Sequence, residues 1–391
     1  MKAVMYGAGN IGRGFIGQLF FNSGYSTSFV DVNKEVLGRL NSDGNYPVRV
    51  LFHEGYEEQL IENVCGVDGS DIGAVAQAIA EADIMATAVG VNVLKFIIEP
   101  LATGIELRYA QSKRPLNIII CENMLGADQY LRELIGEKLS GETRIWFYDN
   151  VGLVEASIGR MVPLQTPEMQ GDSPLRVCVE SFGVLPVDSA AFKGEIPKIK
   201  NMTPFSPFEV YIERKLFVHN MGHALTAYLG ALYGDQYIYQ SINRPEIELI
   251  TLRAMTESAL ALSIRHKVPV IDIYNQVEDL IYRFSNKQLG DTVERVGRDL
   301  RRKLAPNDRM VGTLNSCIEA GVPYKYICLG IAAAMVFPHD KLPEEMPAGD
   351  ILTQVSQIGA SHKAYVLIID LLDMLRRKTP VSKISEYLKT V

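Results

Sequence analysis

The sequence lacks a disulfide framework and any cysteine-based metal motif. Its five cysteines are scattered, odd in number and free of CxxC spacing, which suits a reducing compartment: Cys65, Cys121, Cys178, Cys317 and Cys328. No uncharged apolar run reaches the ~18 residues that a membrane-spanning helix needs. Residues 1–7 meet a glycine too early for a secretory signal and are typical of a first strand instead. We therefore expect a cytoplasmic protein without a membrane span.

Basic residues are fewer than acidic ones, with 39 Lys and Arg against 46 Asp and Glu. The formal net charge of −7 argues against nucleic acid as the main partner. The sequence has no sustained repeats or low-complexity tracts, and its 391 residues exceed the size at which a single core keeps growing. We expect two domains, a small molecule as the partner, and a monomer or weak dimer.

Strand-like and helix-like segments alternate through the first half of the chain. The strand-like segments are apolar or β-branched runs, and the segments between them show helical spacing. This alternation predicts an α/β fold with a parallel, doubly wound sheet of the Rossmann type. The expected strands are 1–6, 27–31, 84–89, 116–121 and 144–148, with helices around 92–108 and 125–138 and a further strand, 175–182, extending the same sheet.

The alternation stops after about residue 190. Residues 163–174 and 186–207 are rich in proline, glycine or polar residues and are expected to be loop or irregular chain. The rest is mainly helical, with helices expected at 211–233, 245–266, 271–285, 312–337 and 361–376. We therefore predict a dinucleotide-binding domain at 1–190 and a mainly helical substrate domain at 191–391, with the ligand cleft between them.

A glycine-rich turn follows the first expected strand. A lone GxGxxG is a weak signal, but this one lies between a strand and a helix at the head of the domain, where a dinucleotide fingerprint belongs. Gly7 permits the tight turn, Gly9 lets the backbone approach a pyrophosphate, and Gly12 allows close packing of helix on strand. Together with Asn10 and Ile11, these residues are the expected cofactor-binding loop; a purely structural glycine turn is the alternative.

The second expected strand ends in an acid, Asp31, at the distance from the glycines that a ribose-binding carboxylate requires. Asp31 would accept hydrogen bonds from the adenosine ribose and repel a 2′-phosphate, which favours NAD over NADP. Two alternatives stay open: Asp31 as an ordinary strand-end residue, and NADP binding through Arg13.

Reactive side chains gather in residues 211–224. If this segment is an α-helix, steps of about 100° place His219, His223 and Asn220 at about 40°, 80° and 140° from Lys215. An amine, an amide and two imidazoles would then share one arc of an otherwise apolar helix. We interpret this arc as the catalytic face.

This segment has three other interpretations. His219 and His223 are four residues apart, a spacing for metal ligation, but no third ligand is evident nearby. Tyr211 and Lys215 spell the YxxxK pair of short-chain dehydrogenases, whose glycine pattern and compact length differ, so we treat that match as coincidence. Alternatively, Lys215 is exposed and the histidines are satisfied in the core.

At this segment the sequence resembles the polyol-specific long-chain dehydrogenase/reductase family. The resemblance spans nearly the whole chain and rests on several motifs in order: GAGNIGRGFIG (7–17), CENM (121–124), RKLF…N.GHA..AYLG (214–230) and ERVGRD…RKL…DR (294–309). The family's pattern of a lysine, four residues, an asparagine, two residues and a histidine falls on Lys215, Asn220 and His223.

The resemblance implies a metal-independent, NAD-dependent interconversion of D-mannitol 1-phosphate and D-fructose 6-phosphate. Lys215 would be the general base for alcohol oxidation, Asn220 would hydrogen-bond the oxygen as it gains charge, and His223 would orient the substrate. Asn123, in the CENM motif, is assigned to cofactor binding. An ordinary lysine titrates near pH ~10.4, so a lysine base has to be desolvated or lie beside another cation.

One departure from the family puts the substrate in doubt. Glu155 stands where some relatives place a second amide on the reacting oxygen, and Gly159 replaces the usual acid before Arg160. A carboxylate cannot stabilise an alkoxide unless it is protonated or turned away. Glu155 therefore favours the alternative of an unphosphorylated polyol or a hexuronate. A nucleotide-binding sensor without catalysis is a third possibility, against which the intact lysine, asparagine and histidine argue.

Three arginines are candidates for binding a substrate phosphate. Arg295, Arg298 and Arg302 recur at i, i+3 and i+7 and would share one face of a helix. A solvated basic face is the alternative, and Gly297 warns that the helix is interrupted.

Overall fold

The side chains of the first strand alternate between two hydrophobic core clusters. In the computed structural model, which describes residues 1–124, 126–338 and 347–390, β1 spans Lys2–Tyr6. Ala3 and Met5 point into one core cluster, whereas Val4 and Tyr6 point into another. A strand that is buried on both faces lies inside a sheet covered on both sides.

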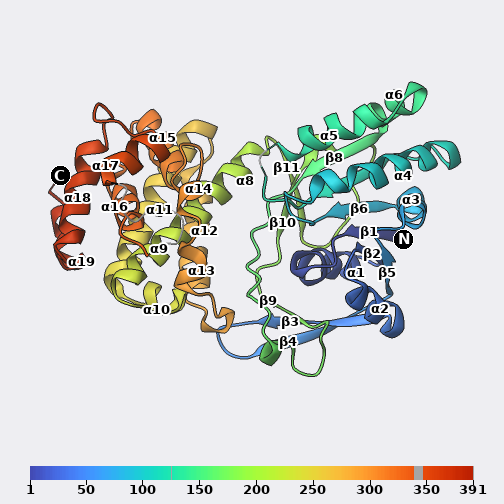
Figure 1. Cartoon of the computed structure of the whole chain (residues 1–391), viewed down its shortest axis with the longest axis horizontal. Helices are drawn as coiled ribbons and strands as arrows, with labels where there is room; N and C mark the ends of the chain where they lie inside the picture. Colours follow the sequence, from blue (N-terminus) through green and yellow to red (C-terminus); the bar gives the residue numbers. More distant parts are fainter. Residues whose placement is uncertain (125, 339–346, 391) are drawn as a thin grey trace. The chain divides into compact units, whose positions relative to one another are not determined.

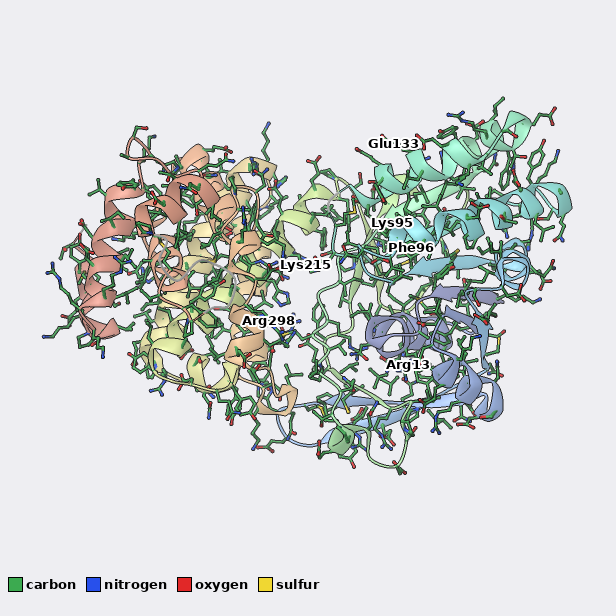
Figure 2. The ribbon with its side chains drawn as sticks, viewed as in Figure 1. Arg13, Lys95, Phe96, Glu133, Lys215 and Arg298 are labelled. Atoms are coloured by element: carbon green, nitrogen blue, oxygen red, sulfur yellow. The ribbon has the colours of Figure 1, made fainter. Side chains whose placement is uncertain are left out.

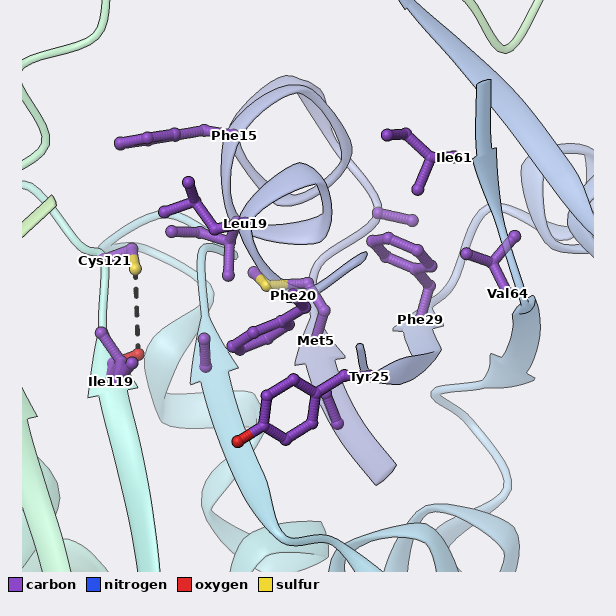
Figure 3. Packing of buried hydrophobic residues seen from close by; sticks show 14 of the residues in the cluster. Met5, Phe15, Leu19, Phe20, Tyr25, Phe29, Ile61, Val64, Ile119 and Cys121 are labelled. Atoms are coloured by element: carbon purple, nitrogen blue, oxygen red, sulfur yellow. Dashed lines mark hydrogen bonds between the residues drawn. The ribbon is translucent and has the colours of Figure 1, made fainter. Parts of the chain in front are cut away.

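That sheet contains six parallel strands in the order β5-β2-β1-β6-β7-β8. Helices α3 to α6 contribute to the core on one face (Figure 1), and η1, α1 and a second small sheet cover the other. Figure 3 shows Phe15, Leu19 and Phe20 of η1 and α1 gathered over the strands that carry Met5 and Ile119. The strands are β1, β2 (Ser26–Asp31), β5 (Val64–Asp68), β6 (Ile84–Thr87), β7 (Leu116–Ile120) and β8 (Val151–Glu155).

The helical segments of this part vary from single turns to four turns. They are η1 (Gly12–Gly17), α1 (Gln18–Asn22), α2 (Lys34–Asp43), α3 (Ile72–Glu81), η2 (Leu94–Phe96), α4 (Ile98–Gln111), α5 (Ala127–Lys138), α6 (Gly141–Asn150), α7 (Pro167–Gln170) and η3 (Ser189–Ala191). Two smaller sheets complete it. One has the order β4-β3-β9 and the other pairs β10 with β11: β3 (Asn45–Leu51), β4 (Tyr56–Glu62), β9 (Val177–Glu180), β10 (Leu185–Asp188) and β11 (Met202–Phe205).

The rest of the chain is helical in the described residues. Helix α9 (Met221–Leu232) is buried along nearly its whole length and contacts α10, α11, α13 and α16. The other helices are α8 (Glu209–Glu213), η4 (Arg214–Asn220), α10 (Ile238–Ile242), α11 (Pro245–His266), α12 (Val270–Phe284), η5 (Lys287–Leu289), α13 (Val293–Gly297), α14 (Leu300–Lys303), α15 (Val311–Ala320), α16 (Lys325–Ala334), α17 (Ala348–Asp350), η6 (Ile351–Val355), α18 (Tyr365–Arg376) and α19 (Val381–Tyr387). None of the described helices is long and apolar enough to span a membrane.

The chain divides into two compact units, Met1–Phe208 and Glu209–Val391. A division at residue 190 would separate β10 from its partner β11, which register together from Leu185 with Met202 to Asp188 with Phe205. The predicted α/β fold with a Rossmann-type sheet and a helical C-terminal unit is confirmed.

Several predicted elements agree with the structure. The strands expected at 1–6, 27–31, 84–89 and 116–121 are β1, β2, β6 and β7, and the helix expected around 92–108 is η2 with α4. The helices at 245–266, 271–285 and 361–376 correspond to α11, α12 and α18, and 211–233 is the continuous run of α8, η4 and α9. Residue 125 of the helix expected at 125–138 lies outside the described residues, and the remainder corresponds to α5.

Other predictions were wrong. Residues 144–148, expected as a strand, lie in α6, because only Phe147 of this aromatic run is buried and propensity yields to that one-sided packing. The strand at 175–182 is β9, which pairs with β3 in a separate sheet rather than extending the first. Residues 312–337 form two helices, α15 and α16, and the stretch 186–207 contains paired strands.

Candidate active site

The glycine-rich loop joins β1 to η1 and requires its glycines for steric reasons. Gly7 has a φ of 105°, and a Cβ there would lie 2.5 Å from the carbonyl oxygen of Ala88. A Cβ on Gly12 would lie 1.9 Å from the oxygen of Gly7, so neither position accepts a side chain. Around Gly9 no atom comes within 4 Å of such a Cβ, and Gly9 and Asn10 are exposed. The loop therefore has open space where a pyrophosphate would approach it.

Asp31 fixes this loop from the end of β2. Its Oδ2 accepts a hydrogen bond of 2.7 Å from the backbone N–H of Ala8, and its Oδ1 accepts from Val32 and Asn33 at 2.8 and 3.0 Å. A carboxylate has about four acceptor positions, so three bonds leave room for a ribose hydroxyl. Asp31 is therefore more than an ordinary strand-end residue, because it ties the end of β2 to the glycine turn.

Arg13 has a structural role. Its side chain is 6% exposed, its Nε donates to the oxygen of Ala8 at 2.7 Å, and its Nη1 donates to the oxygen of Leu175. In Figure 2 the label of Arg13 lies next to η1. A guanidinium held in this way by backbone oxygens is not placed as a ligand for a 2′-phosphate.

A second carboxylate, Glu122, connects the segments that follow β6 and β7. Glu122 is buried, and its two oxygens accept from the backbone N–H groups of Val89 and Gly90, each at 2.8 Å. Burial raises the pKa of Glu122, although these hydrogen bonds oppose the shift. Sequence reasoning named Asn123, which is exposed, and missed the acid beside it. An acid at the end of a buried strand was the available signal.

Lys215 and Asn220 lie in a π-helix, η4, which continues into the α-helix α9. Hydrogen bonds in a π-helix run from residue i to residue i+5, the spacing of these two residues. Lys215 and Asn220 therefore lie closer together around the helix axis than the ~140° of an α-helix. Both are half-buried, and Figure 2 shows Lys215 at the edge of the C-terminal unit.

The charged neighbours of Lys215 in sequence are directed to other partners. Glu213 pairs with His266 at 2.8 Å and with Arg265 at 3.2 Å, both at the end of α11. Arg214 lies over the ring of Tyr211, with 4.2 Å between its guanidinium carbon and the ring centroid. The carboxylate of Glu213 is thus engaged by two partners on α11.

The two histidines of the segment have different surroundings. His219 is buried and its Nδ1 has no hydrogen-bond partner; burial, followed by the charges of Arg283, His223 and Lys215, lowers the pKa of His219 well below its usual value. It is therefore a neutral core residue. His223 stacks on Phe284 with 4.9 Å between ring centroids and 15° between planes.

The second partner of His223 is an aspartate that sequence reasoning missed. The Nε2 of His223 lies 2.9 Å from Oδ2 of Asp291, whose side chain is 9% exposed; this is a close ion-pair contact that is not aligned as a hydrogen bond. Burial raises the pKa of Asp291, but the contact with His223 and its charge, together with Arg295, outweigh burial and lower that pKa overall. Among residues 1–124, 126–338 and 347–390, no group of three or more His, Cys, Asp or Glu side chains is placed to hold a metal ion.

The three arginines predicted to share a helix face do not do so. Helix α13 ends at Gly297, Arg298 is extended with ψ of 171°, and Asp299 has a left-handed φ of 67° before α14 begins. Gly297 has no room for a side chain, because a Cβ there would lie 2.2 Å from the ring of Phe337. The single-face prediction was therefore wrong.

Two of these arginines are held by acids. Arg295 donates from Nε to Oδ1 of Asp291 at 2.8 Å, and Arg302 pairs with Asp299 at 2.5 Å and Asp308 at 3.4 Å. Arg298 is exposed and takes part in none of these ion pairs.

Glu155, at the end of β8, accepts hydrogen bonds from the start of the adjacent helix α5. The backbone N–H groups of Ala127 and Gly126, where α5 begins, donate to its carboxylate. Burial, reinforced by the charge of Asp128, nevertheless raises the pKa of Glu155 to about 7. The acid that departs from the family pattern thus has a structural partner of its own.

Comparison with known proteins gives a consistent result. The family described as "Mannitol dehydrogenase Rossmann domain" matches residues 1–201, and "Mannitol dehydrogenase C-terminal domain" matches residues 208–368. A Brevibacillus brevis protein named mannitol-1-phosphate 5-dehydrogenase is 39% identical over 92% of this chain and 91% of its own length. One of the same name from Thermoanaerobacter pseudethanolicus is 37% identical over 88% of both chains.

Solved structures share the fold at lower sequence identity. A substrate-free D-sorbitol dehydrogenase superposes with a TM-score of 0.78 at 14% identity, covering 96% of this chain and 93% of that one. The ternary complex of Pseudomonas fluorescens mannitol 2-dehydrogenase with NAD and D-mannitol gives 0.76 at 16% identity, covering 100% and 95%.

Proposed function

Because the chain belongs to the mannitol dehydrogenase family, we propose that it is an NAD-dependent oxidoreductase that interconverts D-mannitol 1-phosphate and D-fructose 6-phosphate. Two relatives named for this activity match at 37–39% identity over most of their length. The structural observation that carries the proposal is the five-residue spacing of Lys215 and Asn220 along a π-helix, one α-helical turn before His223.

The glycine turn and Asp31 are the proposed site for NAD. The open space at Gly9 fits a pyrophosphate, and Asp31 has acceptor capacity left for the adenosine ribose. Gly7, Asn10, Ile11 and Gly12 form the remainder of the loop, and Asn123 follows β7 at the same edge of the sheet. When bound, NAD would accept a hydride from the alcohol and, as NADH, return it to the ketone. Asp31 and the engaged Arg13 both favour NAD over NADP.

The proposed proton chemistry belongs to the C-terminal unit. Lys215 takes the proton from the substrate hydroxyl at its Nζ during oxidation and returns it to the carbonyl oxygen during reduction. The amide of Asn220 donates a hydrogen bond to that same oxygen, which is strongest when the oxygen carries the most charge. His223 hydrogen-bonds a neighbouring hydroxyl and so orients the polyol. No metal is assigned to this mechanism.

The substrate phosphate is assigned to the turn between α13 and α14. Of the three predicted arginines, Arg298 is the most available, because Arg295 and Arg302 are held by aspartates. The same ion pairs favour the second candidate, a dehydrogenase of the same family that acts on an unphosphorylated polyol or a hexuronate.

Initial rates of NADH and NADPH oxidation with fructose 6-phosphate, fructose and fructuronate test the proposal. We expect kcat/KM to be highest for fructose 6-phosphate with NADH. A preference for fructose or fructuronate would establish the second candidate. Binding of NADH without turnover of any of the three would instead indicate a sensor and would contradict both.

Location and assembly are further proposals. We propose the cytoplasm, because five scattered cysteines that are free in the structure suit a reducing compartment. We propose a monomer or weak dimer, which sedimentation at several protein concentrations would test.

A further inference from the structure

A chain of contacts runs from His223 to Arg295 through the carboxylate of Asp291. Oδ2 of Asp291 faces His223 Nε2 at 2.9 Å, and Oδ1 of the same side chain accepts from Arg295 Nε at 2.8 Å. The two oxygens of Asp291 thus have different partners. One partner is assigned to the substrate's hydroxyls and the other was predicted to bind its phosphate.

Asp291 is held firmly enough to position another side chain. Its carbonyl oxygen accepts from Ile238 N–H at 2.9 Å, and the next residue, Thr292, caps α13 through a bond from Arg295 N–H to its Oγ1 at 3.2 Å. One face of the imidazole of His223 stacks on the ring of Phe284. This stacking and the contact of Nε2 with Asp291 together restrict the orientation of the imidazole ring.

A carboxylate accepts hydrogen bonds and donates none when ionised, and the pairings of Asp291 keep it ionised. In a neutral imidazole one ring nitrogen carries the proton, and the groups beside the two nitrogens decide which. An ionised carboxylate 2.9 Å from Nε2 repels a lone pair there and attracts an N–H, so it selects the form with the proton on Nε2 although the pair is not aligned as a hydrogen bond. Nδ1 is then left with its lone pair as an acceptor.

We propose that Asp291 is a positioning residue that keeps the proton of His223 on Nε2, so that Nδ1 accepts a hydrogen bond from a substrate hydroxyl. In this arrangement Arg295 holds Asp291 in place and does not bind the substrate phosphate. The inference rests on the proposed function in one respect, namely that His223 contacts the substrate.

The ring nitrogens of His223 report the tautomer directly. In ¹⁵N-histidine-labelled full-length protein, long-range ¹H–¹⁵N spectra distinguish the two neutral forms, and loss of one signal set in His223→Gln assigns it among the six histidines. We expect the proton on Nε2. A proton on Nδ1 of the wild-type ring would overturn the inference, and this readout does not depend on which substrate the enzyme uses.

Asp291→Asn should reverse the tautomer. Because Arg295 donates to the Oδ1 position, the amide oxygen takes that position and the NH₂ group faces Nε2 as a donor. The proton then moves to Nδ1, which can no longer accept from a hydroxyl. The matched control is Asp299→Asn, in which an exposed aspartate paired with Arg302 is replaced at a left-handed position that tolerates asparagine. This control should leave the His223 spectrum unchanged.

Kinetics separate a positioning role from phosphate binding. Asp291→Asn and Arg295→Ala should each lower kcat/KM about tenfold to a hundredfold, by the same factor for fructose 6-phosphate and for fructose. A loss confined to fructose 6-phosphate in Arg295→Ala would overturn the inference by making Arg295 a phosphate ligand. Full activity in Asp291→Asn with a reversed tautomer would overturn it as well, while leaving the proposed reaction intact.

Discussion

Oδ2 of Asp31 accepts a hydrogen bond of 2.7 Å from the backbone N–H of Ala8, so the end of β2 directly restrains the glycine turn after β1. The residue proposed to bind the cofactor ribose therefore also shapes the loop proposed to receive the pyrophosphate. Substitutions at Asp31 therefore change two parts of the cofactor site at once.

Asp31→Ala should raise the KM for NADH about tenfold or more, because it removes a ribose acceptor and releases the Ala8 N–H. NADPH should stay a poor substrate, since Arg13 is engaged by backbone oxygens. Initial rates at varied cofactor concentration check both values. If the variant used NADPH as well as the wild type uses NADH, charge repulsion alone would account for the preference.

Lys215→Ala should lower kcat by about 10²–10⁴-fold while leaving the Kd for NADH within about twofold. Fluorescence titration measures the binding, and stopped-flow absorbance measures hydride transfer. Lys215→Arg is the matched variant, because it keeps the positive charge but cannot release a proton. It should be as inactive as the alanine variant, and substantial activity in either would rule out Lys215 as the base.

Arg298→Ala should raise the KM for fructose 6-phosphate about tenfold and leave the KM for fructose unchanged, because a guanidinium contact to a dianion is lost. Arg302→Ala should have the smaller effect, since Arg302 is already divided between Asp299 and Asp308. Arg244→Ala, which removes an arginine paired with Asp235, serves as the control. Equal effects on both substrates would place the phosphate elsewhere.

Glu155→Gln should change the pH dependence of stability. The pKa of Glu155 lies at about 7 in the folded protein against 4.5 for an ordinary glutamate, so its favourable contribution is complete below pH 4.5 and is lost as the pH rises through 7. After allowance for solvent screening, the glutamine variant should gain about 1–2 kcal/mol relative to wild type between pH 5 and 8. Urea unfolding of the variant and the wild type at pH 5 and at pH 8 measures this change in unfolding free energy.

The control for this experiment is Glu133→Gln, on the exposed side of α5 (Figure 2). This substitution should shift stability equally at the two pH values. A pH-independent effect of Glu155→Gln would contradict the shifted titration.

Lys303→Met should stabilise the protein at neutral pH. Burial, together with the charges of Arg309 and Arg302, lowers the pKa of Lys303 from 10.5 to about 7, although its Nζ donates to the oxygen of Val296. The wild-type protein therefore bears the cost of burying the charge below pH 7 and loses that cost as the pH rises to 10.5. The gain should be at most roughly 4 kcal/mol at pH 6, less the lost hydrogen bond.

Thermal unfolding at pH 6 and pH 10 gives the comparison for Lys303, with the exposed Lys287→Met as the control. The gain should shrink at pH 10. A gain of the same size at both pH values would show that the ammonium group is not destabilised by burial.

Local sterics explain which parts of the site could be predicted from sequence. A side chain at Gly12 would collide with the backbone oxygen of Gly7, and one at Gly7 would collide with that of Ala88, just after the adjacent strand β6. The glycine motif itself therefore indicates that these positions need glycine. The spacing of Lys215, Asn220 and His223 was likewise visible, although the π-helical winding between the first two was not. Segment η4 packs against α11 and α12, and these long-range contacts are not encoded in any local pattern.

Long-range contacts explain what was missed. The pairing of Asp291 with His223 joins a loop before α13 to α9, and Phe337, which follows α16, occupies the space that a side chain at 297 would need. The warning that Gly297 gave was correct, because α13 ends at that residue. Strands β3 and β9 also pair across more than a hundred residues, so the separate sheet could not be foreseen.

The wide turn of η4 has a consequence for the evolution of this segment. A π-turn accommodates one residue more than the ladder of an ordinary helix needs, so deletion of Leu216 could restore regular winding without breaking the helix. In such a shortened chain the amine and the amide would be four residues apart, about 40° around a regular helix, so the two groups would still share a side.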